Sequence, residues 1–176
     1  MTVLFTGGSG CGKSTFAERV MAALPDEKRV YIATMEAADD ESVRRVARHR
    51  AQRAHLHCAT IEQPKALGEA AVPEGAAVLL EDLPNLLAGE MFGGGDWTRI
   101  EADLDALARR CAHLLIVTND VFSDGVRYDE YTTAYLEHLA QINRHAAAMA
   151  DSVVEVVYSI PLAVKGELPC ACFTRS

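Results

Sequence analysis

The segment 3–24 restricts the possible folds of this chain more than any other part of the sequence. It contains the spacing G-x-x-x-x-G-K-[ST], the phosphate-binding P-loop, and the fixed positions of that motif are Gly7, Gly12, Lys13 and Ser14. A short apolar strand precedes the motif, and an amphipathic helix that ends before Pro25 follows it. A glycine-rich turn between a strand and a helix can be only a turn, but with every fixed position present the pattern predicts binding of a nucleoside triphosphate.

The glycines of a P-loop let several backbone N–H groups converge on one phosphate, and the helix N-terminus adds partial positive charge. We expect the Lys13 ammonium to reach the β- and γ-phosphates and the Ser14 hydroxyl to bind Mg²⁺. The residues predicted to contact the nucleotide here are Gly7, Gly8, Ser9, Gly10, Cys11, Gly12, Lys13, Ser14 and Thr15.

Length and composition narrow the class of protein. The 176 residues suit one domain, residues 1–176. A formal net charge of −8 argues against a general nucleic-acid or membrane-surface binder, and no apolar run is long enough to span a bilayer. The 5 cysteines have no framework spacing, which favours a reduced, cytoplasmic protein. Cys170 and Cys172 suit either a soft-metal pair or simple alternation on a terminal strand.

Strands and helices are predicted to alternate along the rest of the chain. The predicted strands are 29–34, 75–80, 114–118, 153–157 and a last extended segment, either near 160–164 or through the cysteine tail; the predicted helices are 39–53, 99–113 and 130–150. This alternation, with nearly continuous apolar strands, predicts a mostly parallel sheet covered by helices on both faces. Ligands of such sheets gather at the carboxyl ends of the strands.

Polar residues follow two of these strands. Glu81 and Asp82 come after an apolar run, which is the Walker B pattern, and an acid there can hold Mg²⁺ beside the P-loop. We prefer Glu81, the first acid, and keep Asp82 as the alternative; both acids can also simply begin a loop. Asn119 and Asp120 follow the next strand, where they can orient a phosphate or a nucleophile, or cap a turn.

The predicted helix 39–53 carries a second candidate group. Arg45, His49 and Arg53 are spaced by four residues and share one helical face. Neighbouring positive charge disfavours the imidazolium, and a neutral imidazole between guanidiniums is suited to attack a phosphate. The alternative is an ordinary solvated basic face. A possible metal pair, His55 and His57, has no third ligand.

These segments together resemble the bifunctional adenosylcobinamide kinase and adenosylcobinamide-phosphate guanylyltransferase family of cobalamin biosynthesis. The resemblance is carried by Gly7-Gly8, Gly12-Lys13-Ser14, Tyr31-Ile32-Ala33-Thr34, Asp39-Asp40-Glu41, Arg45-Val46, His49-Arg50, Arg53, Thr60-x-Glu62, Leu79-Leu80-Glu81, Val117-Thr118-Asn119-x-Val121, Asn143, Ala150-Asp151-x-Val153, Ile160-Pro161 and Lys165. It implies a P-loop NTPase of RecA-like architecture: a three-layer α/β sandwich whose mostly parallel sheet ends in an antiparallel edge strand. It also implies a homotrimer.

The resemblance further implies two reactions. ATP or GTP, with Mg²⁺ held by Ser14 and Glu81, phosphorylates a hydroxyl of adenosylcobinamide. A histidine, here His49, then takes GMP from GTP and passes it to that phosphate. The implied catalytic residues are His49, Lys13 and Glu81, and the implied nucleotide contacts outside the P-loop are Arg45, Arg50, Arg53, Glu62 and Asn119.

The chain also departs from the family pattern, at Gly10 and Cys11 inside the P-loop and in the segments 119–124 and 133–137. These segments are expected near the nucleotide or the corrinoid, so the departures bear on substrate and activity, and not on the fold. Two other classes stay open: a P-loop kinase with a single activity toward another small molecule, and a nucleotide-dependent switch protein.

Overall fold

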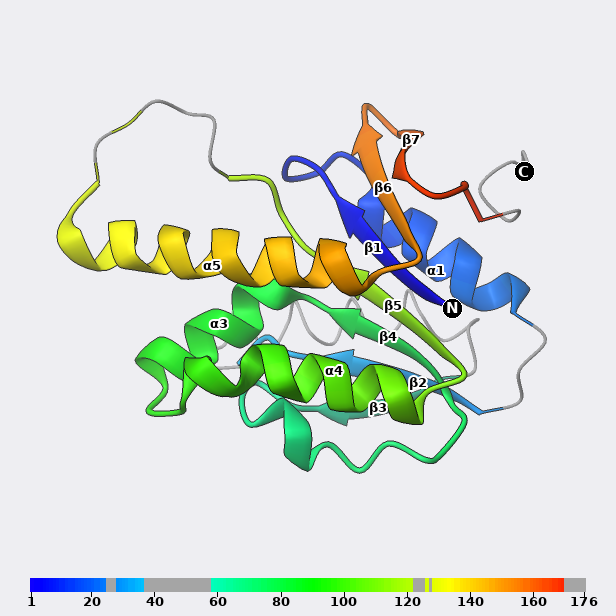
Figure 1. Ribbon diagram of the computed structural model, residues 1–176, viewed down its shortest axis with the longest axis horizontal. Coiled ribbons are helices and arrows are strands. Elements are labelled where there is room, and N and C mark those ends of the chain that lie inside the picture. Colours follow the sequence, from blue (N-terminus) through cyan, green and yellow to red (C-terminus); the bar gives the residue numbers. More distant parts are fainter. Residues whose placement is uncertain (25–27, 37–57, 122–125, 127, 170–176) are drawn as a thin grey trace.

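A computed structural model describes residues 1–24, 28–36, 58–121, 126 and 128–169 of the chain (Figure 1). The strands are β1 (Thr2–Thr6), β2 (Arg29–Ala33), β3 (Ala59–Glu62), β4 (Ala77–Glu81), β5 (His113–Val117), β6 (Ser152–Val157) and β7 (Ile160–Lys165). The helices are α1 (Lys13–Ala23), α3 (Leu83–Phe92), α4 (Ile100–Arg110) and α5 (Glu130–Met149), with short 3-10 turns η2 (Leu67–Glu69) and η3 (Trp97–Arg99). The predicted helix 39–53 lies outside the described residues.

These strands form one 7-stranded sheet in the order β3-β2-β4-β5-β1-β6-β7. Neighbouring strands from β3 to β6 run parallel, and β7 pairs antiparallel with β6 at the edge. The predicted fold class is therefore confirmed, including the antiparallel edge strand. The last extended segment is β7, and the alternative through the cysteine tail falls outside the described residues.

The two faces of the sheet have separate cores. Val3, Phe5 and Leu79 point to the side that α1 covers, where they pack on Phe16 and Val20. Alternate residues of the same strands meet α3, α4 and α5 on the other side; the buried residues there include Leu4, Leu80, Ile116, Leu86, Leu104, Leu139 and Ile142. Figure 1 shows α3, α4 and α5 in front of the sheet and α1 behind it. The arrangement is the predicted three-layer sandwich.

The sequence analysis missed two elements. β3 is a short edge strand whose side chains are mostly exposed, so it lacks the apolar run by which the buried strands were predicted. α3 is absent from the predicted helices as well. It begins directly after β4, because Asp82 caps its first turn through a 2.9 Å bond from the Asn85 N–H.

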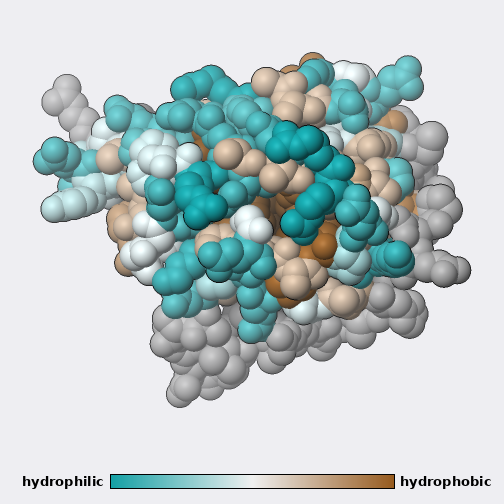
Figure 2. All heavy atoms as spheres, turned by 60° about the horizontal axis from the view of Figure 1, so that its bottom comes forward, coloured by the Kyte–Doolittle hydropathy of each residue, from teal (hydrophilic) through white to brown (hydrophobic). Residues whose placement is uncertain are grey.

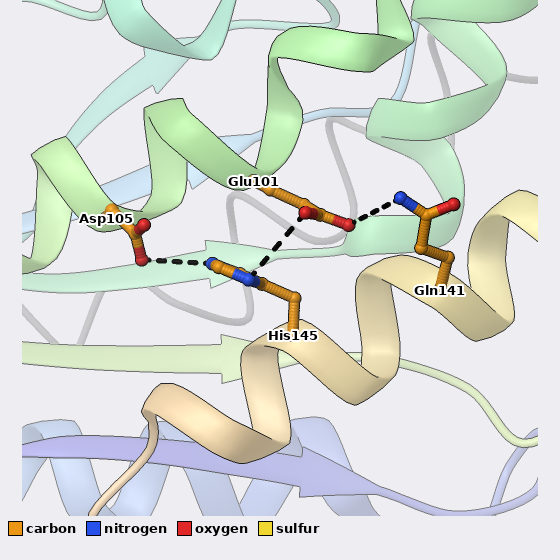
Figure 3. A network of polar contacts seen from close by, with 4 residues as sticks. All are labelled: Glu101, Asp105, Gln141 and His145. Atoms are coloured by element: carbon orange, nitrogen blue, oxygen red, sulfur yellow. Dashed lines mark hydrogen bonds and ion pairs between the residues drawn. The ribbon is translucent and has the colours of Figure 1, made fainter.

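Helices α4 and α5 are joined by a polar cluster between their exposed faces (Figure 3). His145 of α5 lies with Nε2 3.0 Å from Oδ1 of Asp105 and Nδ1 3.7 Å from Oε2 of Glu101. Gln141 donates a 2.9 Å bond to the other oxygen of Glu101. These contacts fix the pairing of the two helices at their solvent edge, above the apolar contact of Leu104 with the core.

Hydrophilic side chains cover most of the face shown in Figure 2, and apolar side chains appear there in small patches between them. None of the helices in the described ranges combines the length and apolar character that crossing a bilayer requires.

The carboxyl ends of the parallel strands meet at one edge of the sheet. In the register of the sheet, Glu62 of β3, Ala33 of β2, Glu81 of β4, Val117 of β5 and Phe5 of β1 form one row. The P-loop therefore begins just beyond Phe5, at the same edge as both glutamates, and this edge carries the candidate site.

Candidate active site

The P-loop connects β1 to α1 through backbone conformations that favour glycine. Gly10 has φ of 71° and Gly12 has φ of 96°, and Gly12 is the residue that precedes the first turn of α1. At Gly7, a Cβ atom would lie 2.5 Å from the carbonyl oxygen of Val156. The loop is thus packed against β6, and it presents the N-terminus of α1 at the carboxyl edge of the sheet.

The Lys13 side chain lies back over this loop. It is only 7% exposed, and its Nζ donates a 3.1 Å hydrogen bond to the carbonyl oxygen of Gly8. The ammonium and the N-terminus of α1 both place positive charge at the P-loop, which is what an anionic phosphate requires. The structure thus places the Lys13 ammonium at the P-loop, and its contact with the β- and γ-phosphates stays a prediction.

Ser14 is joined directly to the end of β4. Its hydroxyl donates a 2.5 Å hydrogen bond to Oε1 of Glu81, and the hydroxyl of Tyr31 donates a 2.9 Å bond to Oε2 of the same carboxylate. The structure thus brings together the two residues predicted as Mg²⁺ ligands, one on α1 and one on β4. A carboxylate and a hydroxyl are hard oxygen donors of the kind that Mg²⁺ prefers.

Among the described residues there is no group of three or more His, Cys, Asp or Glu side chains able to hold a metal. The Ser14 and Glu81 pair fits the way in which Mg²⁺ is usually bound beside a nucleotide, where one or two protein ligands are completed by phosphate oxygens and water.

Asp82 has a different task from Glu81. Its Oδ1 accepts hydrogen bonds from the backbone N–H and the side-chain amide of Asn85, at 2.9 and 2.8 Å, in the first turn of α3. Burial is the main cause that raises the pKa of this carboxyl above its ordinary value, and the charge of Glu81 adds to the effect. The two acids are adjacent in sequence but differ in role: Glu81 contacts the P-loop serine, and Asp82 caps a helix.

The turn between these acids is held from β2. Thr34 accepts a 2.7 Å bond from the Asp82 N–H, donates a 2.8 Å bond to the Asp82 carbonyl, and bonds through its own N–H to the Glu81 carbonyl at 3.1 Å. Neither Thr34 nor Tyr31 is among the predicted site residues. A signal was present, since both belong to a strand predicted to end at this edge.

Asn119 follows β5, the strand between β4 and β1. Its Oδ1 is buried and has no hydrogen-bond partner within the described ranges, while its carbonyl accepts a 3.3 Å bond from Asn143. Asp120 donates from its N–H to the carbonyl of Gly7 at 3.1 Å, which ties this turn to the start of the P-loop. Asn119 thus lies at the predicted edge, between Glu81 and the P-loop in strand order.

A hollow of about 710 Å³ opens beside this turn. It is bounded by the P-loop tip, the first turn of α3, the end of β5 and the inner side of α5, and its lining residues include Ser9, Pro84, Asn119, Asp120, Tyr135 and Leu139. The walls combine apolar side chains with a few polar groups near the P-loop, which is typical of a site for a second, partly apolar ligand.

The remaining predicted residues are not all gathered here. Glu62 ends β3 and is separated from β1 by β2, β4 and β5, so strand spacing puts the two strands about 19 Å apart. Thr15 is exposed on the first turn of α1. His49, Arg45, Arg50 and Arg53 lie outside the described residues, as do the pairs His55 with His57 and Cys170 with Cys172.

Comparisons with known proteins relate most of the chain to one family. The family described as cobinamide kinase / cobinamide phosphate guanyltransferase matches residues 3–164. The bifunctional adenosylcobalamin biosynthesis protein CobP of Pseudomonas aeruginosa is 32% identical over 173 residues, covering 95% of this chain and 99% of that one. The corresponding protein CobU of Escherichia coli is 31% identical over 185 residues, covering 94% of this chain and all of that one.

Among solved structures, the chain is similar to a prototypical ATPase from the type III secretion system of pathogenic bacteria, with a TM-score of 0.50. The identity is 12%, and the match covers 88% of this chain and 50% of the ATPase chain, so this likeness concerns the fold alone.

Proposed function

The chain belongs to the cobinamide kinase / cobinamide phosphate guanyltransferase family, and from this premise we propose how its residues divide the work of two reactions. It is a bifunctional transferase of cobalamin biosynthesis, with a P-loop nucleotide site. In the first reaction ATP or GTP phosphorylates the hydroxyl of adenosylcobinamide. In the second, GMP from GTP is joined to that phosphate, giving adenosyl-GDP-cobinamide and pyrophosphate.

For the kinase step, the backbone amides of the P-loop and Lys13 bind the β- and γ-phosphates. Ser14 and Glu81 would hold Mg²⁺, which neutralises charge on the phosphate oxygens when it is bound. The observation that supports this assignment is the 2.5 Å contact between the Ser14 hydroxyl and Glu81. Tyr31 orients the carboxylate from its other side, and Asn119 contributes an amide near the transferred phosphate.

For the guanylyl step, a ring nitrogen of His49 attacks the α-phosphorus of GTP. A nitrogen–phosphorus bond forms, the bond from the α-phosphorus to the bridging oxygen breaks, and pyrophosphate leaves. A phosphate oxygen of adenosylcobinamide phosphate then attacks the same phosphorus and releases the imidazole. Arg45, Arg50 and Arg53 neutralise the triphosphate during the transfer, and Glu62 contacts the guanosine nucleotide. These roles rest on the sequence and on family membership.

The acceptor arm enters the hollow beside Asn119 and Asp120. Three features of the hollow support this placement: it reaches the P-loop at Ser9, its volume is about 710 Å³, and its walls combine apolar and polar side chains. Of the two polar residues, only Asp120 has a carboxylate that can take the proton of the attacking hydroxyl, so Asn119 is assigned the orienting role.

We further propose that the protein is a cytoplasmic homotrimer. Family resemblance supports the trimer, and the edge strand β7, where Ile160, Leu162 and Val164 are 60%, 47% and 64% exposed, supports association with another chain. An exposed edge strand is a template for pairing with another chain, and exposed apolar patches mark interaction sites. Dependence on ATP and GTP supports the cytoplasmic location.

Turnover tests the proposal. The purified protein is incubated with adenosylcobinamide and γ-labelled ATP, and then with unlabelled GTP, while corrinoid products and pyrophosphate are measured. We expect label in the corrinoid first and pyrophosphate release only afterwards. Phosphorylation of the corrinoid without pyrophosphate release would favour a kinase with one activity, and nucleotide binding without either product would favour a switch protein.

A further inference from the structure

We propose that the turn between β6 and β7 forms the nucleoside subsite, and that the ring of Tyr158 stacks on the base of the nucleotide bound to the P-loop. The proposal rests on the proposed function, because it takes a nucleoside triphosphate at the P-loop as given. Its starting observation is a second hollow, of about 610 Å³, lined by residues 8–11 of the P-loop and by residues 155–159.

The direction of the triphosphate follows from the order of the strands. Ser14 contacts Glu81 on β4, which lies two strands from β1 on one side, whereas β6 lies next to β1 on the other side. Ser14 and Glu81 would hold the metal that accompanies the β- and γ-phosphates, so the γ end of the nucleotide is expected on the side of β4. The α-phosphate and the nucleoside therefore leave the P-loop toward β6, where this hollow lies.

Tyr158 is placed for contact with a ligand and not for packing. Its side chain is 91% exposed, and the residue lies in a tight turn between two paired strands. A tyrosine ring has a large flat face, and bases of any kind stack on such a face.

The backbone conformation of the turn also supports a functional role for Tyr158. Tyr158 has φ of 49° and Ser159 has φ of 61°, so two successive residues that are not glycine occupy the left-handed region. Two-residue hairpin turns with this geometry usually contain Asn-Gly, Asp-Gly or Gly-Gly. Strain of this kind tends to persist where it holds a functional side chain, and here it holds an exposed aromatic ring beside the P-loop.

The turn is also fixed relative to the P-loop. The N–H of Ser159 donates a 2.9 Å hydrogen bond to the carbonyl of Cys11, and a Cβ added at Gly12 would lie 2.9 Å from the Ser159 hydroxyl. The residue that follows Tyr158 thus contacts the phosphate-binding loop directly, and this contact fixes the backbone of Tyr158 beside that loop. The backbone that carries the ring is thus tied to the phosphate cradle, which is what binding both ends of a nucleotide requires.

The test compares Tyr158→Ala and Tyr158→Phe with the wild type in calorimetric titrations. The probes are non-hydrolysable ATP and GTP analogues and inorganic tripolyphosphate, which has the charges but no base. We expect Tyr158→Ala to weaken both nucleotides by about tenfold or more, to similar extents because stacking tolerates either base, and to leave tripolyphosphate binding unchanged. Tyr158→Phe should bind like the wild type.

Tyr131→Ala is the matched control, because Tyr131 is 79% exposed in the first turn of α5 and does not line the hollow. Unchanged nucleotide affinity in Tyr158→Ala would overturn the subsite alone and leave the proposed function standing. Equal weakening of nucleotide and tripolyphosphate would also overturn it, since Tyr158 would then act on the P-loop itself. A wild type that binds neither probe would overturn the proposed function as well.

Discussion

The hydroxyl of Ser14 donates a 2.5 Å hydrogen bond to Oε1 of Glu81, although 67 positions separate these residues in the chain. This contact joins the first turn of α1 to the carboxyl end of β4 across the edge where the P-loop lies. In the proposed function it marks the place where Mg²⁺ would be held for the kinase reaction, and it distinguishes Glu81 from the neighbouring acid.

The first prediction concerns that distinction. Glu81→Gln should lower the rate of corrinoid phosphorylation by about a hundredfold or more, because it removes the charge that would hold Mg²⁺ beside the γ-phosphate. Asp82→Asn should keep near-normal activity, because asparagine caps a helix as well as aspartate does and can still accept from Asn85. Initial rates at saturating ATP measure both. The opposite pattern, with Asp82→Asn inactive and Glu81→Gln active, would exchange the two roles.

The second prediction concerns the close packing of the P-loop on β6. Gly7→Ala should lower the free energy of unfolding by about 1–3 kcal/mol, because the new methyl group meets the Val156 carbonyl and the backbone φ of 138° suits only glycine. Gly8→Ala is the control, since nothing lies within 4 Å of its Cβ position. Urea unfolding gives both values. Equal stability of the two variants would show that the loop is not packed as described.

The third prediction is a pH dependence. The Tyr135 hydroxyl donates a 3.0 Å bond to the carbonyl of Pro84, and burial, with a contribution from the charge of Asp82, raises the pKa of Tyr135 to about 12. Because the folded state resists ionisation of this group, its contribution to stability is complete below pH 10 and is lost as the pH rises toward 12.

Tyr135→Phe should therefore be less stable than the wild type near pH 8, by about 1 kcal/mol for the lost hydrogen bond. The difference should shrink or reverse near pH 11, because phenylalanine cannot ionise. Urea unfolding at the two pH values measures it. A constant difference between the proteins would contradict the assigned pKa shift. The half-buried thiol of Cys111, with its pKa raised to about 11, affects both proteins alike.

Most of the sheet could be predicted because the buried strands are continuous apolar runs. β4 and β5 are examples, since their middle residues are all buried. β3 could not be found this way: at the edge of the sheet its side chains stay exposed, and the alternation that identifies a strand is lost.

The P-loop and Glu81 were accessible from sequence because spacing determines where both lie relative to the strands. The choice between Glu81 and Asp82 was not settled by sequence alone, since it depends on the contact between α1 and β4. One signal was available, however: Asp82 is followed by Leu83 and Pro84, and an acid before a proline in the first turn is a common helix start. The support of Glu81 by Tyr31 is purely tertiary, because it joins neighbouring strands.

The direct test of the account is covalent labelling with GTP that carries the label on its α-phosphorus. The account predicts one label per active site, lost in acid, stable in alkali and absent from His49→Ala, while His49→Ala still phosphorylates adenosylcobinamide. Label that persists in His49→Ala, or an active wild type that never becomes labelled, would contradict it.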